Sequence, residues 1–300
     1  MARARLARQE GAGLAFVSPF FIVFAVFGLF PLLYTAWVSL HEWSLLAGDQ
    51  GWIGLANYRE LAGDSAFWRA LVNTFGIFLL ATVPQLIVAT VLAQVLNSRL
   101  RGRTFWRMGV LLPNVTSVAA VGIIFGLIFA RDYGIVNWFL DQIGLPAVDW
   151  RAHRWSSWLA IATMVDWRWT GYNALILLAA LQSVPQDLYE AAKIDGASAW
   201  RQFWSITVPM LRPTLIFVTI VATIGGIQLF TEPLLFNSGA NAIAGGNLGQ
   251  FQTVAMYLVQ QAFTGQRFGY AATIAWVLFL IIAVASAINV LLLQRIRSAD

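Results

Sequence analysis

The feature that most constrains this chain is the length of its apolar intervals between charged residues. A bilayer core about 30 Å thick is crossed by a helix of roughly 20 apolar residues. The sequence contains six such intervals, at approximately residues 13–40, 70–96, 108–130, 155–181, 214–235 and 268–293. Only 11% of the 300 residues are charged, whereas a soluble domain carries roughly 25%. We therefore expect an all-α, polytopic membrane protein with six transmembrane helices, organised as a single transmembrane domain over residues 1–300.

The first interval follows the basic stretch ARARLAR, which is also typical of a signal peptide. Its apolar run is about twice the length of a signal-peptide core, and no convincing small-residue cleavage site follows it. We interpret it as a permanent span.

The basic residues predict the orientation, because cytoplasmic loops carry an excess of Lys and Arg. One set of alternate loops holds twelve of them, which are Arg3, Arg5, Arg8, Arg99, Arg101, Arg103, Arg107, Lys193, Arg201, Arg212, Arg295 and Arg297. The other set holds six, which are Arg59, Arg69, Arg131, Arg151, Arg154 and Arg267. Both termini should therefore face the cytoplasm of a bacterial cell, with the chain in its inner or plasma membrane. The net charge of +5 then indicates contact with anionic membrane lipid and not with nucleic acid.

Two outer loops differ in character. The loop between the first two spans is mixed and turn-rich, with Gly51, Gly54 and Gly63 as breaks. Residues 237–252 are polar, rich in Gly and Asn, and uncharged, so we expect a mobile external loop. The amphipathic stretch TVAMYLVQQAF that follows is too short for a seventh span and predicts an interfacial helix.

Residues 183–213 form a polar segment between the fourth and fifth spans. Ser183 and Pro185 are typical of a helix start, and Asp195-Gly196 should break that helix near Ile194. Ser198 can then cap a second helix that ends before Pro209. An amphipathic connector lying on the inner leaflet is the alternative interpretation.

The spacing inside this segment resembles a known motif. Glu190-Ala191-Ala192 is followed after three residues by Gly196, and after nine more by Ile206-Thr207-Val208-Pro209. This resembles the EAA loop of permease subunits in binding-protein-dependent ABC importers, with Val208 in place of the usual Leu. The wider stretch LQSVPQDLYEAAKIDGASAWRQFWSITVPMLRP is similar to the carbohydrate-uptake branch with maltose-type membrane subunits.

The resemblance implies that the loop docks into a cytoplasmic ATPase subunit, with Glu190, Ala191, Ala192, Gly196 and Pro209 as coupling residues. It also implies a heteromeric complex with a second homologous permease, two ATPase subunits and an extracellular or periplasmic sugar-binding protein. Sugar would then pass inward by alternating access around a central site.

Several chemistries lack the residues they need. The only Lys is Lys193, preceded by Ala192, so no phosphate-binding P-loop can form. ATP and Mg²⁺ are therefore expected in the partner ATPase subunits, with no cofactor in this chain. The chain has no Cys, and its two His, His41 and His153, are too sparse for a metal site and are expected at the surface or interface. We predict no catalytic residue and no enzyme activity.

Polar side chains inside a span are candidates for a transport site because they are costly in lipid. The fourth span contains the densest cluster, DWRWTGYN, and its aromatic and amide groups suit a sugar. The resemblance points to this span and to the fifth. Our predicted substrate-pathway residues are Asp166, Trp167, Trp169, Gly171, Tyr172, Asn173, Gln228 and Thr231.

Other interpretations of these residues stay open. The Trp and Tyr side chains are also typical of an interfacial belt, and Asp166 with Arg168 suits a structural pair with the partner permease. Gly225-Gly226 suits close helix packing, and Glu232 is expected at the outer edge of its span.

Two other functions compete with a sugar importer. A glycerol-3-phosphate or phosphodiester importer permease would use Arg168 for its anion. An ion-coupled secondary transporter would need intramembrane carboxylates and, usually, inverted repeats.

Overall fold

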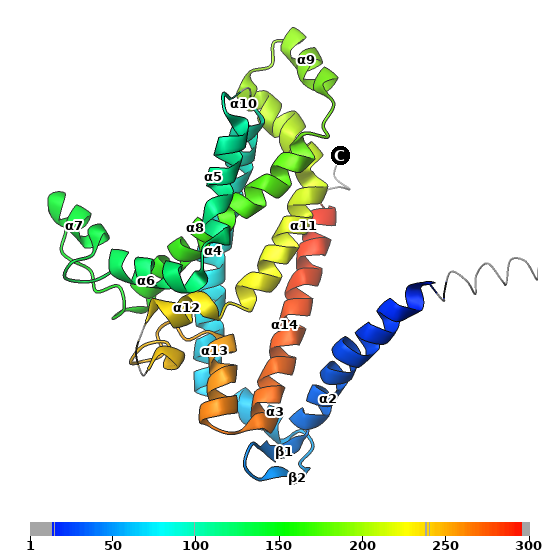
Figure 1. Ribbon diagram of the computed structural model, residues 1–300, viewed down its shortest axis with the longest axis vertical. Coiled ribbons are helices and arrows are strands. Elements are labelled where there is room, and N and C mark those ends of the chain that lie inside the picture. The colour runs from blue at the N-terminus through cyan, green and yellow to red at the C-terminus, as the bar shows by residue number, and fades with distance from the viewer. Residues whose placement is uncertain (1–13, 15, 99, 238, 240, 296–300) are drawn as a thin grey trace, which may run out of the picture. The chain divides into compact units, whose positions relative to one another are not determined.

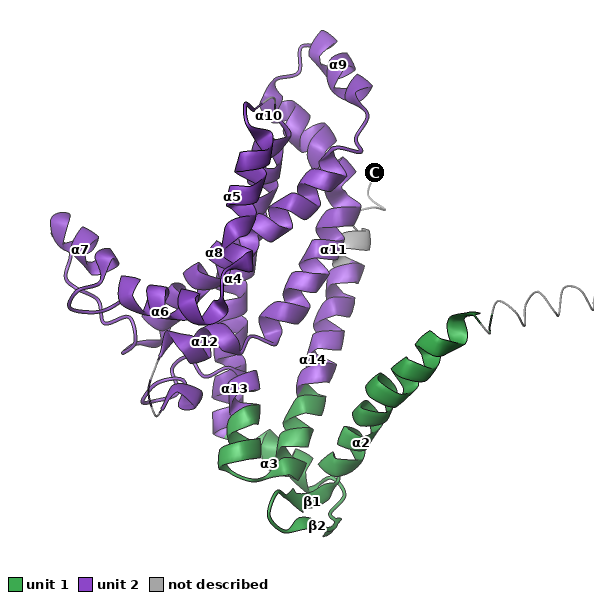
Figure 2. Cartoon of the chain, viewed as in Figure 1, with its two compact units in different colours: residues 1–64, 258–277 green, residues 65–257, 278–300 purple. Residues whose placement is uncertain are grey.

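The computed structural model describes residues 14, 16–98, 100–237, 239 and 241–295 (Figure 1). Of the basic residues used to predict orientation, Arg3, Arg5, Arg8, Arg99 and Arg297 lie outside these residues, as does the start of the first predicted span. The described chain is mostly helical, and it divides into two compact units (Figure 2). The expected all-α polytopic class is confirmed.

The first unit comprises residues 1–64 and 258–277. A helix continuous over Phe16–Ser39 includes the π-helical turn η1 (Ala25–Leu29) and α2 (Phe30–Ser39). A two-stranded antiparallel hairpin, β1 (His41–Ser44) and β2 (Gly48–Trp52), then leads to α3 (Ala56–Gly63). The turn η4 (Gln260–Thr264) and the first part of α14 (Phe268–Arg295) complete this unit.

The hairpin was not foreseen, because its loop shows turn residues but no alternating apolar pattern. Gly48 adopts φ +69° at the turn, a left-handed conformation that favours glycine. His41 lies here and is only 6% exposed, with Nδ1 2.8 Å from the Trp37 carbonyl oxygen. The expectation that His41 is a surface residue is therefore wrong.

The second unit is built on two long helices, α4 (Ser65–Asn97) and α8 (Arg154–Leu181), which pack along each other. Between them in sequence lie α5 (Arg103–Val115), α6 (Val118–Ile128) and α7 (Ile135–Gln142). After α8 come α9 (Gln186–Ile194), α10 (Ala199–Gln202), η2 (Phe203–Thr207), α11 (Val208–Ile227) and α12 (Thr231–Phe236). The turn η3 (Ala242–Ala244), α13 (Val254–Val259) and the end of α14 follow.

Buried apolar side chains form two clusters along the α4–α8 pair. One contains Ile77, Trp158, Ile161, Met164 and Phe236, and the other contains Ala89, Ala93, Ala174, Leu177 and Leu211. The small alanines let the helix backbones approach closely. The two clusters hold α4, α8 and α11 as one scaffold around the cavity described below.

Four described helices are long and apolar enough to cross a membrane, namely Phe16–Ser39, Ser65–Asn97, Ala199–Ile227 and Phe268–Leu291. The pair α5 and α6 would add a fifth span, but it is bent by 88°. Helix α8 covers the predicted fourth span with 28 residues, although Arg154, Asp166 and Arg168 lower its hydropathy.

The third predicted span, residues 108–130, is therefore not one straight helix. Thr116 and Ser117 are extended between α5 and α6. Pro113 lacks a backbone N–H, and the Thr116 hydroxyl donates to the Leu112 carbonyl oxygen at 2.8 Å. Both features weaken helix continuation at this point.

The loop at residues 237–252, which we expected to be external and mobile, is held more firmly than expected. The Asn73 side-chain amide donates to the Gly249 carbonyl oxygen at 2.8 Å, and the Gln250 amide donates to the Arg151 carbonyl oxygen at 3.0 Å. Phe251 is fully buried in the core. The expectation of a mobile loop is wrong for residues 250–252, because their side chains are buried inside the protein. The short helix expected after this loop is present as α13 and η4.

Candidate functional site

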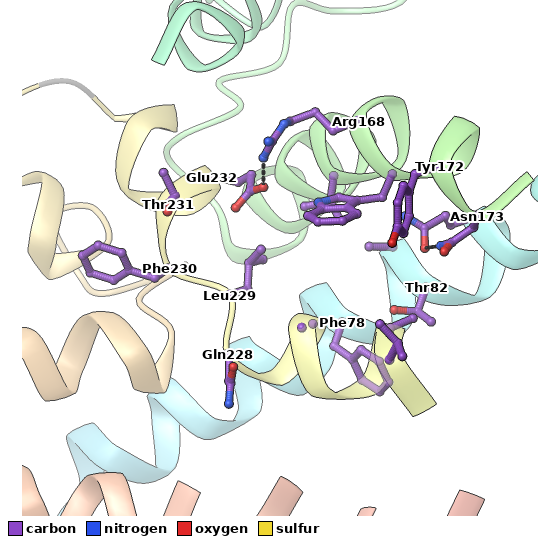
Figure 3. Close-up of a pocket in the computed structure, with 18 of the residues that line it drawn as sticks. Phe78, Thr82, Arg168, Tyr172, Asn173, Gln228, Leu229, Phe230, Thr231 and Glu232 are labelled. Atoms are coloured by element: carbon purple, nitrogen blue, oxygen red, sulfur yellow. Dashed lines mark hydrogen bonds and ion pairs between the residues drawn. The ribbon is translucent and has the colours of Figure 1, made fainter. Parts of the chain in front are cut away.

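A cavity of about 370 Å³ lies between α4, α8 and the end of α11 with the start of α12 (Figure 3). The segments that line it are far apart in sequence but belong to the same unit. Its lining residues are Phe78, Ala81, Thr82, Gln85, Val118, Val165, Arg168, Trp169, Tyr172, Asn173, Val221, Ala222, Gly225, Gly226, Gln228, Leu229, Phe230, Thr231 and Glu232. The cavity is partly open and combines aromatic rings, amides and hydroxyls in one space.

Helix α8 presents one face to the cavity. Val165, Arg168, Trp169, Tyr172 and Asn173 follow the spacing of three, one, three and one residues, which is one stripe of an α-helix. The Trp169 and Tyr172 rings meet edge to face, with centroids 5.8 Å apart. These rings offer flat apolar surfaces next to the Asn173 amide, so this wall has the groups that bind the faces and hydroxyls of a sugar ring.

Helix α4 forms the facing wall. Phe78, Ala81, Thr82 and Gln85 share a stripe of the same kind, and the Asn173 side-chain amide donates to Gln85 Oε1 at 3.1 Å. None of the α4 residues was predicted from the sequence. The signal that could have found them is Thr82 and Gln85, two polar residues three positions apart near the middle of the predicted span.

The third wall is a break in the predicted fifth span. Helix α11 ends at Ile227, and helix α12 begins only at Thr231, so the expected continuous helix over residues 214–235 is wrong. Gly225 and Gly226 precede the break and disfavour helix there. The Leu229 carbonyl oxygen accepts a hydrogen bond from the Thr253 hydroxyl at 2.7 Å. The break brings Gln228 and Thr231 to the cavity, as Figure 3 shows.

The cavity wall contains a buried ion pair. Arg168 Nη1 contacts Glu232 Oε1, with only 13% and 7% of the two side chains exposed. The Arg168 guanidinium also lies 5.7 Å from the centre of the Trp169 ring. We expected Glu232 at an outer edge, where a charge is not costly, but its side chain is buried against Arg168 of α8.

Three of the predicted pathway residues lie outside the cavity lining. Asp166 points elsewhere on α8, and its Oδ1 is buried with no hydrogen-bond partner among the described residues. Trp167 packs against Phe125, with ring centroids 5.7 Å apart. A Cβ on Gly171 would lie 1.8 Å from the Val110 carbonyl oxygen, so Gly171 allows α5 and α8 to touch. The other five, Trp169, Tyr172, Asn173, Gln228 and Thr231, do line it.

The predicted coupling segment lies at one end of this unit. Helix α9 ends in a Schellman motif, in which the Gly196 N–H donates to the Lys193 carbonyl at 3.0 Å and the Ala197 N–H to the Ala192 carbonyl at 2.9 Å. Gly196 has φ +75°, a conformation that disfavours side chains. The Ser198 hydroxyl then accepts from the Arg201 N–H at 3.3 Å, which confirms the predicted cap.

Two details of the predicted coupling segment are wrong. Pro185 is the N-cap of α9, and the Ser183 hydroxyl instead donates back to the Ala180 carbonyl oxygen of α8. The second helix does not end before Pro209, since residues Ala199–Ile227 form one continuous helix. Pro209 therefore lies inside this helix, just after the π-helical turn η2, and its missing N–H is accommodated where η2 passes into α11.

The surface of the coupling segment is open. No residue of α9 is buried, and Glu190 and Ala191 are exposed while Ala192 is half-buried. Tyr189 attaches the helix to the body through its hydroxyl, 3.0 Å from the Thr207 hydroxyl. Next to α9 is a polar groove of about 930 Å³, lined by Gln94, Asn97, Ser98, Arg103, Gln182, Gln186, Tyr189, Glu190, Lys193 and Gln202. Among the described residues, no cluster of His, Cys, Asp and Glu is suited to a metal ion.

Comparison with known proteins identifies the family. Residues 61–298 match the family of the binding-protein-dependent transport system inner membrane component. The chain belongs to this family. The multi-pass membrane fold agrees with this membership.

Curated relatives in the family are sugar transport permeases. The arabinooligosaccharides transport system permease protein AraP of Halalkalibacterium halodurans is 35% identical over 95% of this chain and 88% of its own length. The lactose transport system permease protein LacF of Rhizobium radiobacter is 38% identical over 91% of each chain. The trehalose/maltose transport system permease protein MalF of Thermococcus litoralis is 34% identical over 74% of this chain and 76% of its own length.

A solved structure shares the fold of the present chain along nearly its whole length. A chain of a bacterial ABC transporter that imports the acidic polysaccharide alginate superposes with a TM-score of 0.80 and 21% identity, over 99% of both chains. A second structure, of the alginate transporter in complex with an alginate pentasaccharide-bound periplasmic protein, gives a TM-score of 0.77 over 97% of this chain and 95% of the other.

Proposed function

We propose that this chain is the permease subunit of an ATP-driven ABC importer that moves a carbohydrate, of di- or oligosaccharide size, into the cytoplasm. The observation that carries the proposal is the cavity lined by Trp169, Tyr172 and Asn173, in a chain whose curated relatives are named as sugar permeases. Aromatic faces and amide groups bind the two kinds of surface that a sugar presents.

The proposed mechanism is alternating access driven from outside the chain. A loaded sugar-binding protein docks on the outer side, and two ATPase subunits close on the cytoplasmic side. Their closure moves α9 as a rigid body, and the attached spans then rotate around the cavity. A second homologous permease completes the pathway, and both termini of this chain face the cytoplasm. The chain itself makes and breaks no covalent bond.

The structure of α9 supports its role as the ATPase contact. Its exposed face includes Glu190 and Ala191, and small side chains permit another surface to approach closely. The Schellman motif at Gly196 and the cap at Ser198 fix the angle at which the chain leaves α9 and enters the long helix toward α11. A push on α9 is therefore delivered to a helix that reaches the cavity.

Substitution on this face tests the proposal. The chain is coexpressed with a tagged ATPase subunit, a second permease and a sugar-binding protein from the same organism, and the complex is purified on the tag. Ala191→Trp should remove this chain from the purified complex and lower ATP-dependent sugar uptake at least tenfold. Ala47→Trp, at an exposed turn of the β-hairpin, is the matched control and should do neither. Normal copurification and uptake by the Ala191 variant would refute the docking assignment.

A further inference from the structure

The charges of the cavity cancel within its own wall. Of the residues that line it, Arg168 and Glu232 are the two with ionised side chains, and they contact each other. The polar remainder is neutral and consists of Thr82, Gln85, Tyr172, Asn173, Gln228 and Thr231, with Trp169 as a further donor. The cavity wall therefore has groups for hydroxyls but no net charge for an acid or an amine.

This neutrality depends on one contact across the break in the fifth span. Arg168 lies in α8 and Glu232 in the first turn of α12, 64 residues later in the chain. Only 13% of the Arg168 side chain and 7% of the Glu232 side chain are exposed, so water screens neither charge well. Figure 3 shows the two side chains meeting beside the Tyr172 and Asn173 wall.

Without Glu232, the same wall would be an anion site. A guanidinium has up to five donors in a planar fork that matches carboxylates and phosphates. Arg168 lies beside the cavity and over the Trp169 ring, so its donors would face an incoming ligand once the carboxylate was removed. Arg168 Nε already has no partner among the described residues.

We propose that Glu232 is a specificity-determining residue, which occupies the Arg168 guanidinium and so restricts the cavity to uncharged saccharides. Sugars with a carboxylate or phosphate are rejected because they would have to displace Glu232 from Arg168, leaving a buried carboxylate unpaired. This inference rests on the proposed function, in which the cavity lies on the sugar pathway.

Titration calorimetry on the full-length chain in lipid nanodiscs, with any subunits that copurify, tests the inference. The matched probes are lactose and lactose 6-phosphate, which differ only in the phosphate. Glu232→Gln should bind lactose 6-phosphate at least tenfold more tightly than the wild type, with less than threefold change for lactose. Arg168→Gln/Glu232→Gln should lose that gain, because the guanidinium is gone. No gain in the single variant, or a gain that persists in the double variant, would overturn the proposal.

The reverse substitution keeps the test valid if the Glu232 variant does not fold. Arg168→Gln leaves Glu232 as the only ionised group of the cavity wall, so glucosamine should bind at least tenfold more tightly than to the wild type, whereas glucose should not. Equal binding of glucosamine by the variant and the wild type would contradict the inference.

These results are independent of the importer test. Binding of the charged probes requires neither ATPase subunits nor transport. If the variants change their preference for charged ligands as expected but the chain supports no ATP-dependent sugar uptake, the proposed function is refuted and the role of Glu232 is kept. If uptake is present but the variants bind charged ligands as the wild type does, the role of Glu232 is refuted and the proposed function is kept.

Discussion

The coupling segment and the cavity each depend on contacts, but the contacting residues are separated by very different distances along the sequence. The hydrogen bonds that end α9 and cap the next helix join residues three to five positions apart, as from Ala197 to Ala192 and from Arg201 to Ser198. The cavity depends on contacts between residues 64 and 88 positions apart, as between Arg168 and Glu232 and between Asn173 and Gln85. Substitutions in the first region should act locally, whereas those in the second should disturb the packing of whole helices.

The largest effect is expected where α8 touches α5, directly behind the cavity wall. In Gly171→Ala the new Cβ would meet the Val110 carbonyl oxygen at 1.8 Å, and a backbone group cannot turn aside as a side chain can. The two helices must separate, which we expect to lower the free energy of unfolding by about 3 kcal/mol, at the upper end for overpacked cores. A fall in thermal melting temperature in detergent would measure it.

Gly225→Ala is the matched control for that prediction. Gly225 also lies in a helix beside the cavity, but a Cβ there would meet no atom within 4 Å. Its melting temperature should stay equal to or above that of the wild type, because alanine favours helix over glycine. Equal losses at the two positions would mean that helix contact is not what distinguishes Gly171.

In the coupling segment, replacing a glycine should act through backbone conformation and not through a steric contact. A Cβ on Gly196 would meet no atom within 4 Å, but the residue has φ +75°, which costs a residue with a side chain about 1–2 kcal/mol. Gly196→Val should loosen the end of α9 and reduce both copurification of the ATPase subunit and ATP-dependent uptake, without changing the melting temperature of the body. Gly196→Asn should behave like the wild type, since Asn tolerates left-handed backbone. If Val and Asn variants are equally impaired, the cause is the side chain at the docking face and not the backbone.

The same difference in range explains what could be predicted from the sequence. The cap at Ser198, the break at Gly196 and the positions of four long helices, Phe16–Ser39, α4, α8 and α14, follow from local residue types and apolar length, and the structure confirms them. The continuation through Pro209 was missed because proline usually ends a helix and the π-helical turn η2 before it has no signal in the sequence. The bend at Thr116 was missed because a bend changes no apolar count.

The sequence predicted those cavity residues that can be recognised within one span. Trp169, Tyr172 and Asn173 were found by their cost in lipid, whereas Glu232 was misplaced because its partner lies in another helix. Gln85 was missed for the same reason, since its partner Asn173 is 88 residues away. Pairings between distant segments leave no spacing pattern in one sequence.

A smaller effect is expected at the cap of the helix that follows α9. Ser198→Ala removes the hydroxyl that accepts from the Arg201 N–H, a loss of about 1 kcal/mol. The amides of α10 should then exchange with deuterium about fivefold faster, while those of α8 are unchanged. Ser205→Ala, at an exposed position of η2 within the same helix, should leave exchange unaltered. Faster exchange throughout the unit would show that the cap stabilises more than its own turn.

The smallest effect is expected for the hydrogen bond that joins the two principal walls of the cavity. Both Asn173 and Gln85 are buried, at 6% and 4% exposure, and their amides lie 3.1 Å apart. Hydrogen bonds between transmembrane helices contribute only about 0.6 kcal/mol on average, because the separated helices find other partners. A double-mutant cycle with Asn173→Leu and Gln85→Leu should therefore give a coupling energy near this value in thermal unfolding. A coupling above about 2 kcal/mol would exceed the range for such bonds, and would mean that this contact, more than the apolar packing of α4 on α8, sets the spacing of the cavity walls.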